Sequence, residues 1–307
     1  MVHAKPGLAG KKSGKAKAMK GVILAGGSGT RLRPLTQVTS KQLLPVFDKP
    51  MIYYPLSTLI HAGVNEVLII STPVDTPRIE ELLGDGHQFG ISISYMVQQK
   101  PEGLAQGVNM SSSFVNEENF WFILGDNFFH GPAFGANLKQ VSETHKQGSL
   151  IFAYRVMDPS AYGVVTFIGD SDEIAELVEK PRSSKPGWAI PGLYRFDAKA
   201  ATYFKKIKPS SRGELEIIDL LEEYRITKTL NVEKISRGNA WFDLGSVESL
   251  QIGSQFVQAI QSRQGQLIGS PEEAALRAGF LSEANFHNRL NQQPQSAYYD
   301  LLRSYFN

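Results

Sequence analysis

A short apolar strand that runs directly into a glycine-rich loop is the feature that most constrains this fold. Residues 22–25 (VILA) are followed by residues 26–31 (GGSGTR), which hold three glycines within four positions. The apolar run is typical of a buried parallel strand. Glycine lets backbone N–H groups converge and lets a phosphate approach without a Cβ clash. The sequence therefore predicts a strand that ends in an anion-binding loop.

Further apolar runs recur along the chain and alternate with segments of helical pattern. The apolar runs cover 67–70, 91–97, 120–124 and 150–156, and the helical segments cover 52–62, 76–83, 105–114 and 138–146. This alternation predicts an α/β, Rossmann-like fold with a mixed, mostly parallel sheet flanked by helices. Ligands of such sheets bind outside the carboxyl ends of the strands. The glycine loop and residues 125–127 (GDN) both lie at such ends.

The pattern changes after about residue 160 and again near residue 247. Short strand-like runs at 164–168, 174–178 and 189–196 predict an inserted antiparallel section. From residue 247 the pattern is helical, and Pro271 suits a helix start. We expect a disordered basic tail over 1–19, an α/β core over 20–160, a section over 161–246 that completes the core, and a C-terminal helical segment over 247–307.

Composition limits the functions that this chain can have. It has 307 residues and no cysteine, so disulfides and thiolate chemistry are excluded. Six lysines and no acid fall within residues 1–20, which leaves 26 basic and 30 acidic residues elsewhere. This mildly acidic body does not indicate a nucleic-acid partner. The sequence contains neither a long apolar span nor a secretory signal, so we expect a cytoplasmic protein without a membrane partner.

The glycine loop differs from two common nucleotide-binding motifs. A Walker A loop has Lys-Ser/Thr after its last glycine, but Gly29 is followed by Thr30 and Arg31. A dinucleotide fingerprint has a third glycine or alanine where Leu32 stands, which disfavours a nicotinamide oxidoreductase. Arg31 and Arg33 add charge beside the loop amides, and an arginine fork binds phosphate through two hydrogen bonds. A plain glycine-rich turn with exposed arginines stays the alternative for the loop alone.

A series of ordered motifs links this chain to a known family. The loop continues as 26–36 (GGSGTRLRPLT) and is followed by 40–46 (SKQLLPV). Further motifs are 48–56 (DKPMIYYPL), 103–106 (GLAQ), 124–127 (LGDN), 162–165 (YGVV), 179–181 (EKP), 212–217 (RGELEI) and 241–243 (WFD). In this order they resemble the sugar-nucleotide pyrophosphorylases over roughly residues 19–290, and most closely the glucose-1-phosphate thymidylyltransferase branch of that family.

The resemblance implies a Mg²⁺-dependent nucleotidylyl transfer. In the family, an oxygen of glucose 1-phosphate attacks the α-phosphorus of dTTP in line, and dTDP-glucose and pyrophosphate form. The nucleophile belongs to the substrate, so positioning and electrostatics carry most of the catalysis. The family commonly forms homotetramers and feeds dTDP-rhamnose and other deoxysugar pathways. It also implies that 20–160 binds nucleotide, 161–246 binds sugar phosphate, and 247–307 serves oligomerisation or regulation.

Residue by residue, the resemblance assigns the active site. The implied catalytic residues are Arg31, Lys41, Asp126 and Lys180, and the implied Mg²⁺ ligands are Asp126 and Asp243. The nucleotide-binding set, in which Gln98 and Gly103 read the base, is Leu24, Gly26, Gly27, Gly29, Thr30, Arg31, Gln42, Gln98, Gly103 and Asp126. The sugar-phosphate set is Tyr162, Gly163, Glu179, Lys180, Ile190, Gly192 and Arg212. Without the family, Asp126 and Asp243 equally suit turn aspartates.

A second nucleotide site, at a subunit interface, is also implied. Its matching residues are Gly131, Arg237, Gly238, Glu273 and Arg277. Gly135 and Ala136 stand where the family usually has larger polar residues. Two further departures are Leu244, where the family has threonine after the aspartate, and Pro191, which removes a backbone donor beside the sugar pocket.

Two other interpretations stay open from the sequence. The first is the same chemistry with UTP, or with galactose or glucosamine 1-phosphate. The second is a noncatalytic nucleotide-sensing relative. Retention of Arg31, Lys41, Asp126, Lys180 and Asp243 together argues against the second.

Overall fold

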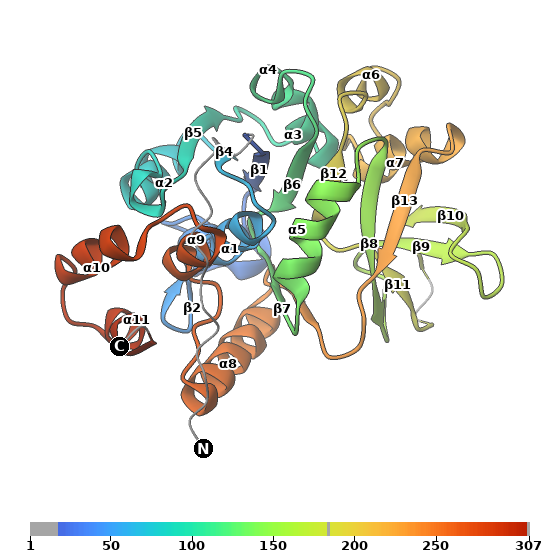
Figure 1. The fold of residues 1–307 in the computed structure, drawn as a ribbon. Coiled ribbons are helices and arrows are strands. Elements are labelled where there is room, and N and C mark those ends of the chain that lie inside the picture. The colour runs from blue at the N-terminus through green and yellow to red at the C-terminus, as the bar shows by residue number, and fades with distance from the viewer. Residues whose placement is uncertain (1–17, 183–184, 306–307) are drawn as a thin grey trace.

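The strand that precedes the glycine loop lies inside a ten-stranded sheet (Figure 1). In the computed structural model, which describes residues 18–182 and 185–305, β1 (Lys20–Ala25) lies between β4 (Glu66–Ser71) and β6 (Phe120–Leu124) and runs parallel to both. Strand β5 (Ser92–Val97) pairs in parallel with β4. Alternate residues of β1 enter two different hydrophobic clusters, one on each face of the sheet. The predicted α/β fold with a parallel core is confirmed.

The other half of the sheet is mainly antiparallel. From β6 the order continues through β12 (Leu193–Phe196), β8 (Ser149–Val156), β11 (Gly187–Ala189), β9 (Gly163–Phe167) and β10 (Ile174–Glu179). Strand β13 (Leu230–Lys234) pairs in parallel with β8. The predicted antiparallel section is therefore present, and it extends the core sheet.

The strand predicted over 189–196 is wrong, because the structure has two strands there. Strand β11 ends at Ala189, and β12 begins at Leu193 between β6 and β8. Pro191 has no N–H to donate. The N–H of Gly192 is bonded to the Asn127 side chain. Ile190 and Gly192, in the intervening backbone, line a cavity.

Helices cover both faces of the sheet. One face carries α1 (Tyr53–His61), α2 (Thr76–Leu83), α5 (Phe134–Thr144) and α9 (Pro271–Ala278). The other carries α3 (Leu104–Met110), α4 (Ser112–Val115), α6 (Ala200–Phe204) and α7 (Ile217–Ile226). The single helix predicted over 105–114 is divided at Ser111, and α5 begins four residues before the predicted 138–146 helix.

Short elements connect the core to the loops of interest. The described part of the chain contains three 3₁₀ helices, which are η1 (Thr30–Leu32), η2 (Lys41–Leu43) and η3 (His87–Phe89). Strands β2 (Pro45–Val46) and β3 (Lys49–Pro50) form one small ladder. Strands β7 (Asn127–His130) and β14 (Ala240–Asp243) form another. The second ladder carries residues of two predicted site motifs.

The chain is helical after residue 247, as predicted. It forms α8 (Val247–Gln264), α9, α10 (Glu283–Asn291) and α11 (Ala297–Tyr305), shown from orange to red in Figure 1. Ser246 and Ser249 form a capping box at the start of α8. Ser270 caps α9, in which Pro271 is the first residue. The last helix docks through Tyr298 and Leu302, which are 7% and 0% exposed.

The N-terminal tail is described only at its end. Residues 1–17 of the predicted disordered segment lie outside the described residues. Met19, which was predicted to belong to that segment, donates its backbone N–H to the Asn65 side chain over 2.9 Å and accepts from the Asn65 N–H. Within the described ranges, no helix combines the length and apolarity that a bilayer crossing requires.

Candidate active site

A cavity of about 470 Å³ opens at the carboxyl ends of β1 and β6. It brings together residues from the glycine loop, the inserted section and β14, which lie far apart in the sequence. Its lining residues are Leu24, Gly26, Arg31, Lys41, Leu104, Leu124, Asp126, Asn127, Ala161, Tyr162, Gly163, Glu179, Lys180, Ile190, Gly192, Tyr194, Glu214, Ile217, Ile218, Trp241 and Asp243. All four predicted catalytic residues and both predicted metal ligands are among them.

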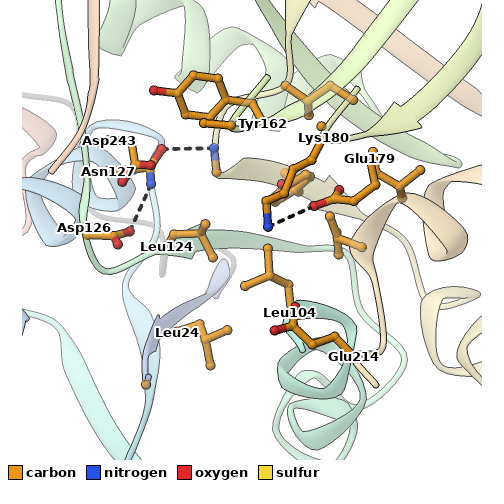
Figure 2. Close-up of a pocket in the computed structure, with 18 of the residues that line it drawn as sticks. Leu24, Leu104, Leu124, Asp126, Asn127, Tyr162, Glu179, Lys180, Glu214 and Asp243 are labelled. Atoms are coloured by element: carbon orange, nitrogen blue, oxygen red, sulfur yellow. Dashed lines mark hydrogen bonds and ion pairs between the residues drawn. The ribbon is translucent and has the colours of Figure 1, made fainter. Parts of the chain in front are cut away.

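The cavity has two polar ends separated by apolar side chains (Figure 2). Asp126, Asn127 and Asp243 lie on one side, and Glu179 and Lys180 lie on the other. Leu124 lies between the two groups, and Leu24 and Leu104 lie below them in this view. A ligand that spans the cavity would therefore meet charged groups at both ends and an apolar surface in the middle.

The glycine loop has the backbone geometry that close approach requires. Gly27 and Gly29 have φ values of 102° and 56°, which favour glycine. The Thr36 hydroxyl donates to the Gly29 carbonyl over 2.7 Å and fixes the turn. Gly26 lines the cavity, whereas Gly27, Gly29 and Thr30 do not. The predicted nucleotide set is therefore only partly gathered around this cavity.

Lys41 reaches the carboxylate that follows β6. Its Nζ lies 2.5 Å from Oδ2 of Asp126, which is 6% exposed. Ser40 caps η2 by accepting from the Gln42 N–H, and this turn directs Lys41 towards the cavity. The predicted return of this lysine over the glycine loop thus places a cation beside a buried acid.

The β7–β14 ladder brings the two predicted metal ligands together. Asp243 pairs with Asn127, the residue after Asp126, and the Leu244 N–H donates to the Asp126 carbonyl over 2.9 Å. Asn127 donates to Asp126 Oδ1 over 3.1 Å. Its own Oδ1 accepts from the Trp241 indole over 2.6 Å and from the Gly192 N–H over 3.0 Å. Asn127 therefore joins the acidic end to the backbone of Gly192, a residue of the predicted sugar-phosphate set.

The two aspartates have opposite pKa shifts. Burial alone would raise the pKa of Asp126, but the charge and hydrogen bond of Lys41 outweigh it and lower that pKa. Burial raises the pKa of Asp243, and the neighbouring Asp126 charge raises it further against Arg31 and Lys41. An added Cβ at Gly245 would lie 2.8 Å from the Arg31 guanidinium and 2.9 Å from Asp243 Oδ1. Arg31 thus lies beside Asp243.

A buried carboxylate at Asp126 and a half-buried one at Asp243, with adjacent charges, fit a hard divalent cation. Mg²⁺ is commonly held by one or two carboxylates, with substrate phosphate and water completing the shell. The described residues contain no cluster of three or more His, Cys, Asp or Glu side chains that could enclose a metal by themselves. The donor set of Asp126 and Asp243 therefore suits an ion shared with a phosphate ligand.

Lys180 and Glu179 form the other polar end. Lys180 Nζ lies 3.4 Å from Glu179 Oε1, and the Lys180 backbone has a φ of 45°, which is uncommon for a residue with a side chain. Its N–H donates to the Tyr162 carbonyl, which holds the turn. Burial raises the pKa of Glu179, against the opposing charge of Lys180. Tyr162 packs edge-on against Trp241, with ring centroids 4.9 Å apart.

Glycines allow close backbone approach at this end. A Cβ at Gly192 would lie 2.5 Å from Leu124 Cγ, and one at Gly163 would lie 2.8 Å from Ile218 Cδ1. The Ile190 N–H donates to the Gly163 carbonyl over 2.8 Å. The predicted sugar-pocket residues of this segment thus share one wall.

Arg212 does not line the cavity, in contrast to the rest of the predicted sugar-phosphate set. Its Nη2 lies 2.8 Å from both carboxylate oxygens of Glu216 and 3.2 Å from Glu179 Oε1. The hydrogen bond to Glu216 raises the pKa of the guanidinium. This carboxylate cluster holds Arg212 against its own loop.

Three further members of the nucleotide set lie outside the lining, and two of them, Gln42 and Gln98, contact Gly26. Gln42 is 2% exposed, and its Nε2 lies 3.5 Å from the Gly26 carbonyl. Gln98 is 3% exposed, and a Cβ at Gly26 would lie 2.4 Å from its Oε1. Gly103 has a φ of 115°, and a Cβ there would lie 2.3 Å from the Leu215 carbonyl oxygen.

Sequence reasoning missed several cavity residues. Asn127 and Trp241 belong to motifs quoted from the sequence, and their adjacency to a predicted acid was the available signal. The apolar lining carried no such signal, because its side chains look like ordinary core residues. The missed set is Leu104, Leu124, Asn127, Ala161, Tyr194, Glu214, Ile217, Ile218 and Trp241.

The departure at Leu244 lies outside the site. Leu244 is fully buried and packs with Val257 and Phe242, so its side chain points into the core beneath α8. Leucine here fills a hydrophobic cluster, and the aspartate before it keeps its place in β14.

A second cavity, of about 710 Å³, is lined by Gly131, Glu273 and Arg277 of the predicted regulatory set. Arg277 pairs with Glu273 over 2.8 Å. Arg237 and Gly238 line a separate cavity of about 680 Å³. Asn239, the residue after Gly238, lies against Gly131, since a Cβ at Gly131 would be 2.1 Å from its Oδ1.

Comparison with known proteins agrees with this geometry. The profile of the nucleotidyl transferase family matches residues 20–259. A glucose-1-phosphate thymidylyltransferase of Mycolicibacterium smegmatis is 47% identical over 91% of this chain and 96% of that relative. The enzyme of the same name from Neisseria meningitidis serogroup A is also 47% identical, with the same shares covered.

Solved structures give the same picture. A Bacillus anthracis protein provisionally named glucose-1-phosphate thymidylyltransferase, in complex with a sucrose, superposes with a TM-score of 0.70 at 37% identity. The alignment covers 78% of this chain and 95% of that one. A UDP-glucose pyrophosphorylase complexed with UDP-glucose has the same fold, with a TM-score of 0.70 at 23% identity over 79% and 99% of the two chains. This chain is thus an enzyme of the nucleotidyl transferase family, and it belongs to the glucose-1-phosphate thymidylyltransferases within it.

Proposed function

We propose that this enzyme converts dTTP and α-D-glucose 1-phosphate to dTDP-glucose and pyrophosphate. The observation that carries the proposal is a single cavity with the Lys41–Asp126–Asp243 group at one end and Lys180–Glu179 at the other. A phosphate oxygen of the sugar phosphate forms a bond to the α-phosphorus of dTTP. The bond to the bridging oxygen breaks, and its electron pair leaves with pyrophosphate.

The acidic end suits the triphosphate. Arg31 and Lys41 supply positive charge where negative charge builds up on the leaving pyrophosphate and on the α-phosphoryl oxygens. Asp126 and Asp243 would hold Mg²⁺, which neutralises phosphate charge when bound. Lys41 also keeps Asp126 ionised through the ion pair that lowers its pKa. A carboxylate that a neighbouring ammonium keeps ionised can ligate a metal ion at neutral pH.

The opposite end suits the sugar phosphate. Lys180 would bind the phosphate of the acceptor, and Glu179 would accept hydrogen bonds from sugar hydroxyls. Arg212 stands 3.2 Å from Glu179, so a side-chain rotation away from Glu216 would let it join Lys180 on the same phosphate. The negative charge of the bound sugar phosphate would then take the place of the carboxylates that surround the Arg212 guanidinium in this structure.

The region beside Gln98, where the nucleotide base would bind, suits thymine or uracil. Gln98 offers an amide oxygen beside Gly26, and Gly103 packs against the backbone of Leu215. The methyl group that separates thymine from uracil contributes only ~1–3 kcal/mol of discrimination. We therefore expect slower but measurable use of UTP.

Regulation and assembly are part of the same proposal. The second cavity, lined by Glu273 and Arg277, would bind a feedback nucleotide, with Arg237 and Gly238 contributing from the adjacent cavity or a neighbouring subunit. We propose a cytoplasmic homotetramer whose product supplies dTDP-rhamnose or another dTDP-deoxysugar. Gly135 and Ala136 leave this cavity without two polar side chains, so we expect weak feedback inhibition.

A pyrophosphate-release assay over a grid of nucleotides and sugar phosphates tests the proposal. The highest kcat/KM is expected for dTTP with glucose 1-phosphate, with dTDP-glucose identified by mass spectrometry. Chelation of divalent cations should stop the reaction, and added Mg²⁺ should restore it. A preference for another pair by more than tenfold, or no pyrophosphate release with any pair, would contradict the proposal.

A further inference from the structure

We propose that Gln106 is a positioning residue which fixes the amide orientation of Gln98 and so sets the preference for thymine and uracil over cytosine. This inference rests on the proposed function, because it takes Gln98 as the residue that faces the base. It concerns a hydrogen-bond relay of three side chains, Gln98, Gln106 and Glu102, at the start of α3.

The relay begins at a group whose hydrogen-bond role cannot change. An ionised carboxylate only accepts hydrogen bonds. Gln106 Nε2 lies 2.7 Å from Glu102 Oε2, so the NH₂ group of Gln106 has to face Glu102. The backbone N–H of Glu102, which only donates, lies 3.0 Å from Gln106 Oε1. Two fixed partners on one residue therefore dictate which way the Gln106 amide points.

Gln106 in turn fixes the orientation of the Gln98 amide. Since Gln106 presents its oxygen, Gln98 has to present its NH₂ group, and Gln98 Nε2 lies 2.6 Å from Gln106 Oε1. The Gln98 backbone is held as well, because its N–H donates to the Ser71 carbonyl over 2.7 Å. The oxygen of Gln98 must then point the other way, towards the glycine loop.

The orientation of Gln98 determines which pyrimidine edge fits. Its Oε1 lies so close to Gly26 that an added Cβ would be 2.4 Å away, and no donor in the described part of the chain bonds to it. This unpaired acceptor complements the N3–H of thymine and uracil. Cytosine has an unprotonated nitrogen at N3, so a lone pair of that nitrogen and a lone pair of Gln98 Oε1 would face each other with no proton between them. A flipped Gln98 would reverse that preference.

The loop that carries the relay is itself fixed. The Leu215 N–H donates to the Glu102 carbonyl over 2.7 Å, and the Ala105 N–H donates to the Leu215 carbonyl over 3.2 Å. Gly103, between them, packs directly on Leu215. The backbone at both ends of the relay is therefore anchored, and the orientation of the Gln98 amide depends on the side chains of the relay.

Substitution of Gln106 separates positioning from folding. Gln106→Met keeps a flexible side chain of good helix propensity but removes the amide. We expect the ratio of kcat/KM for dTTP over CTP to fall by on the order of tenfold, since a misplaced buried polar group costs a free-energy difference of that size. The dTTP to UTP ratio should stay constant, because both bases carry N3–H. The double variant Gln98→Met/Gln106→Met should match Gln98→Met alone.

An exchange of the two relay groups provides the rescue. In Glu102→Gln/Gln106→Glu, the acid at 106 accepts from Gln98 and from the backbone N–H at 102, and the new amide at 102 donates to it. The dTTP to CTP ratio should return to within about threefold of wild type by the same hydrogen-bond accounting. Asn109→Met, half-buried on the same helix, is the matched control and should leave the ratio unchanged.

The outcomes distinguish this inference from the proposed function. If wild type uses dTTP but Gln106→Met keeps the wild-type ratio, the inference is overturned and the function stands. If wild type releases no pyrophosphate from any nucleotide, the function fails, and dissociation constants for dTTP, UTP and CTP then decide the inference. An equal dTTP to CTP binding ratio in wild type and Gln106→Met, or no binding by either, would overturn it.

Discussion

The ammonium of Lys41 and the carboxylate of Asp126 form an ion pair across 85 positions of the chain, with Nζ 2.5 Å from Oδ2. Both side chains line the cavity, and Asp126 is almost fully buried. The pair has two consequences. It holds an acid in its charged form where the proposed Mg²⁺ would bind, and it places a positive charge where the proposed phosphates would meet.

Lys41→Ala is expected to lower kcat by about 10²–10³-fold, because a preorganised charge at a reacting phosphate typically contributes that much. The fold should survive, since η2 is held by Ser40 and by backbone bonds. Steady-state pyrophosphate release and circular dichroism check the two parts. Lys205→Ala, at an exposed lysine directly after α6 and outside the cavity lining, should retain wild-type turnover. A loss of less than fivefold for Lys41→Ala would exclude a catalytic role.

Asp243→Asn is expected to abolish activity and yet stabilise the metal-free protein at pH 7–8. The folded-state pKa of Asp243 is raised by burial and by Asp126. A raised acid pKa contributes stability that is present below the unfolded-state value and is lost as pH rises through the folded-state value. The variant escapes that loss, so its melting temperature should exceed wild type by about 2 °C.

Melting curves recorded with a chelator from pH 4 to pH 8 check this expectation. The advantage of Asp243→Asn should shrink towards acid pH, where wild-type Asp243 is already protonated. Added Mg²⁺ should raise the melting temperature of wild type more than that of the variant. An advantage that is independent of pH would show that the two acids do not repel each other.

Protonation of His61 should destabilise the enzyme in acid. Burial, followed by the charge of Arg277, lowers the pKa of His61 to about 4. A lowered histidine pKa contributes stability that is full above the unfolded-state value and is lost as pH falls from about 6.5 to 4. The loss is at most about 3 kcal/mol for this shift.

Denaturant unfolding of wild type and His61→Gln between pH 4 and pH 7 measures that contribution. The variant should show a shallower fall in unfolding free energy over this window. Parallel curves would mean that other groups cause the acid sensitivity.

Leu244→Thr, which restores the usual family residue, is expected to cost about 2–4 kcal/mol of stability, because it removes methyl groups and buries a hydroxyl in a packed cluster. A Cβ at Gly253 would lie 2.6 Å from Leu244 Cδ2, which shows how closely α8 packs there. Turnover of the folded variant at 20 °C should stay within threefold of wild type. Urea unfolding and initial rates check both, with Leu244→Val as a milder comparison.

The sequence was most informative where function depends on neighbouring residues. The glycine loop, Lys41 and the strand before Asp126 are local patterns, and the structure brings Gly26, Lys41 and Asp126 to one cavity. The closeness of Asp126 and Asp243 could not follow from residues alone. It depends on the register of β7 against β14, which is a nonlocal pairing.

Side-chain competition explains the positions where expectation and structure differ. Arg212 was assigned to a phosphate, but Glu216, four residues later, binds its guanidinium in this structure. Strand 189–196 was predicted as continuous because most of its residues are apolar. The break at 190–192 follows from the hydrogen bonds of Gly192, whose N–H donates to the Asn127 side chain and whose carbonyl accepts from the Leu124 N–H. Asn127 and Leu124 are both far from Gly192 in the sequence, so the break was not visible there.

Leu215 contributes its N–H to Glu102 and its carbonyl to Ala105, so one peptide segment supports both the loop at residues 102–103, which we propose lies beside the base, and the loop that carries Arg212. We therefore expect selectivity for the nucleotide and selectivity for the sugar phosphate to change together. A substitution that moves Leu215 to suit a larger sugar will also disturb nucleotide choice, and directed evolution towards a new sugar should acquire compensating changes near residues 102–106.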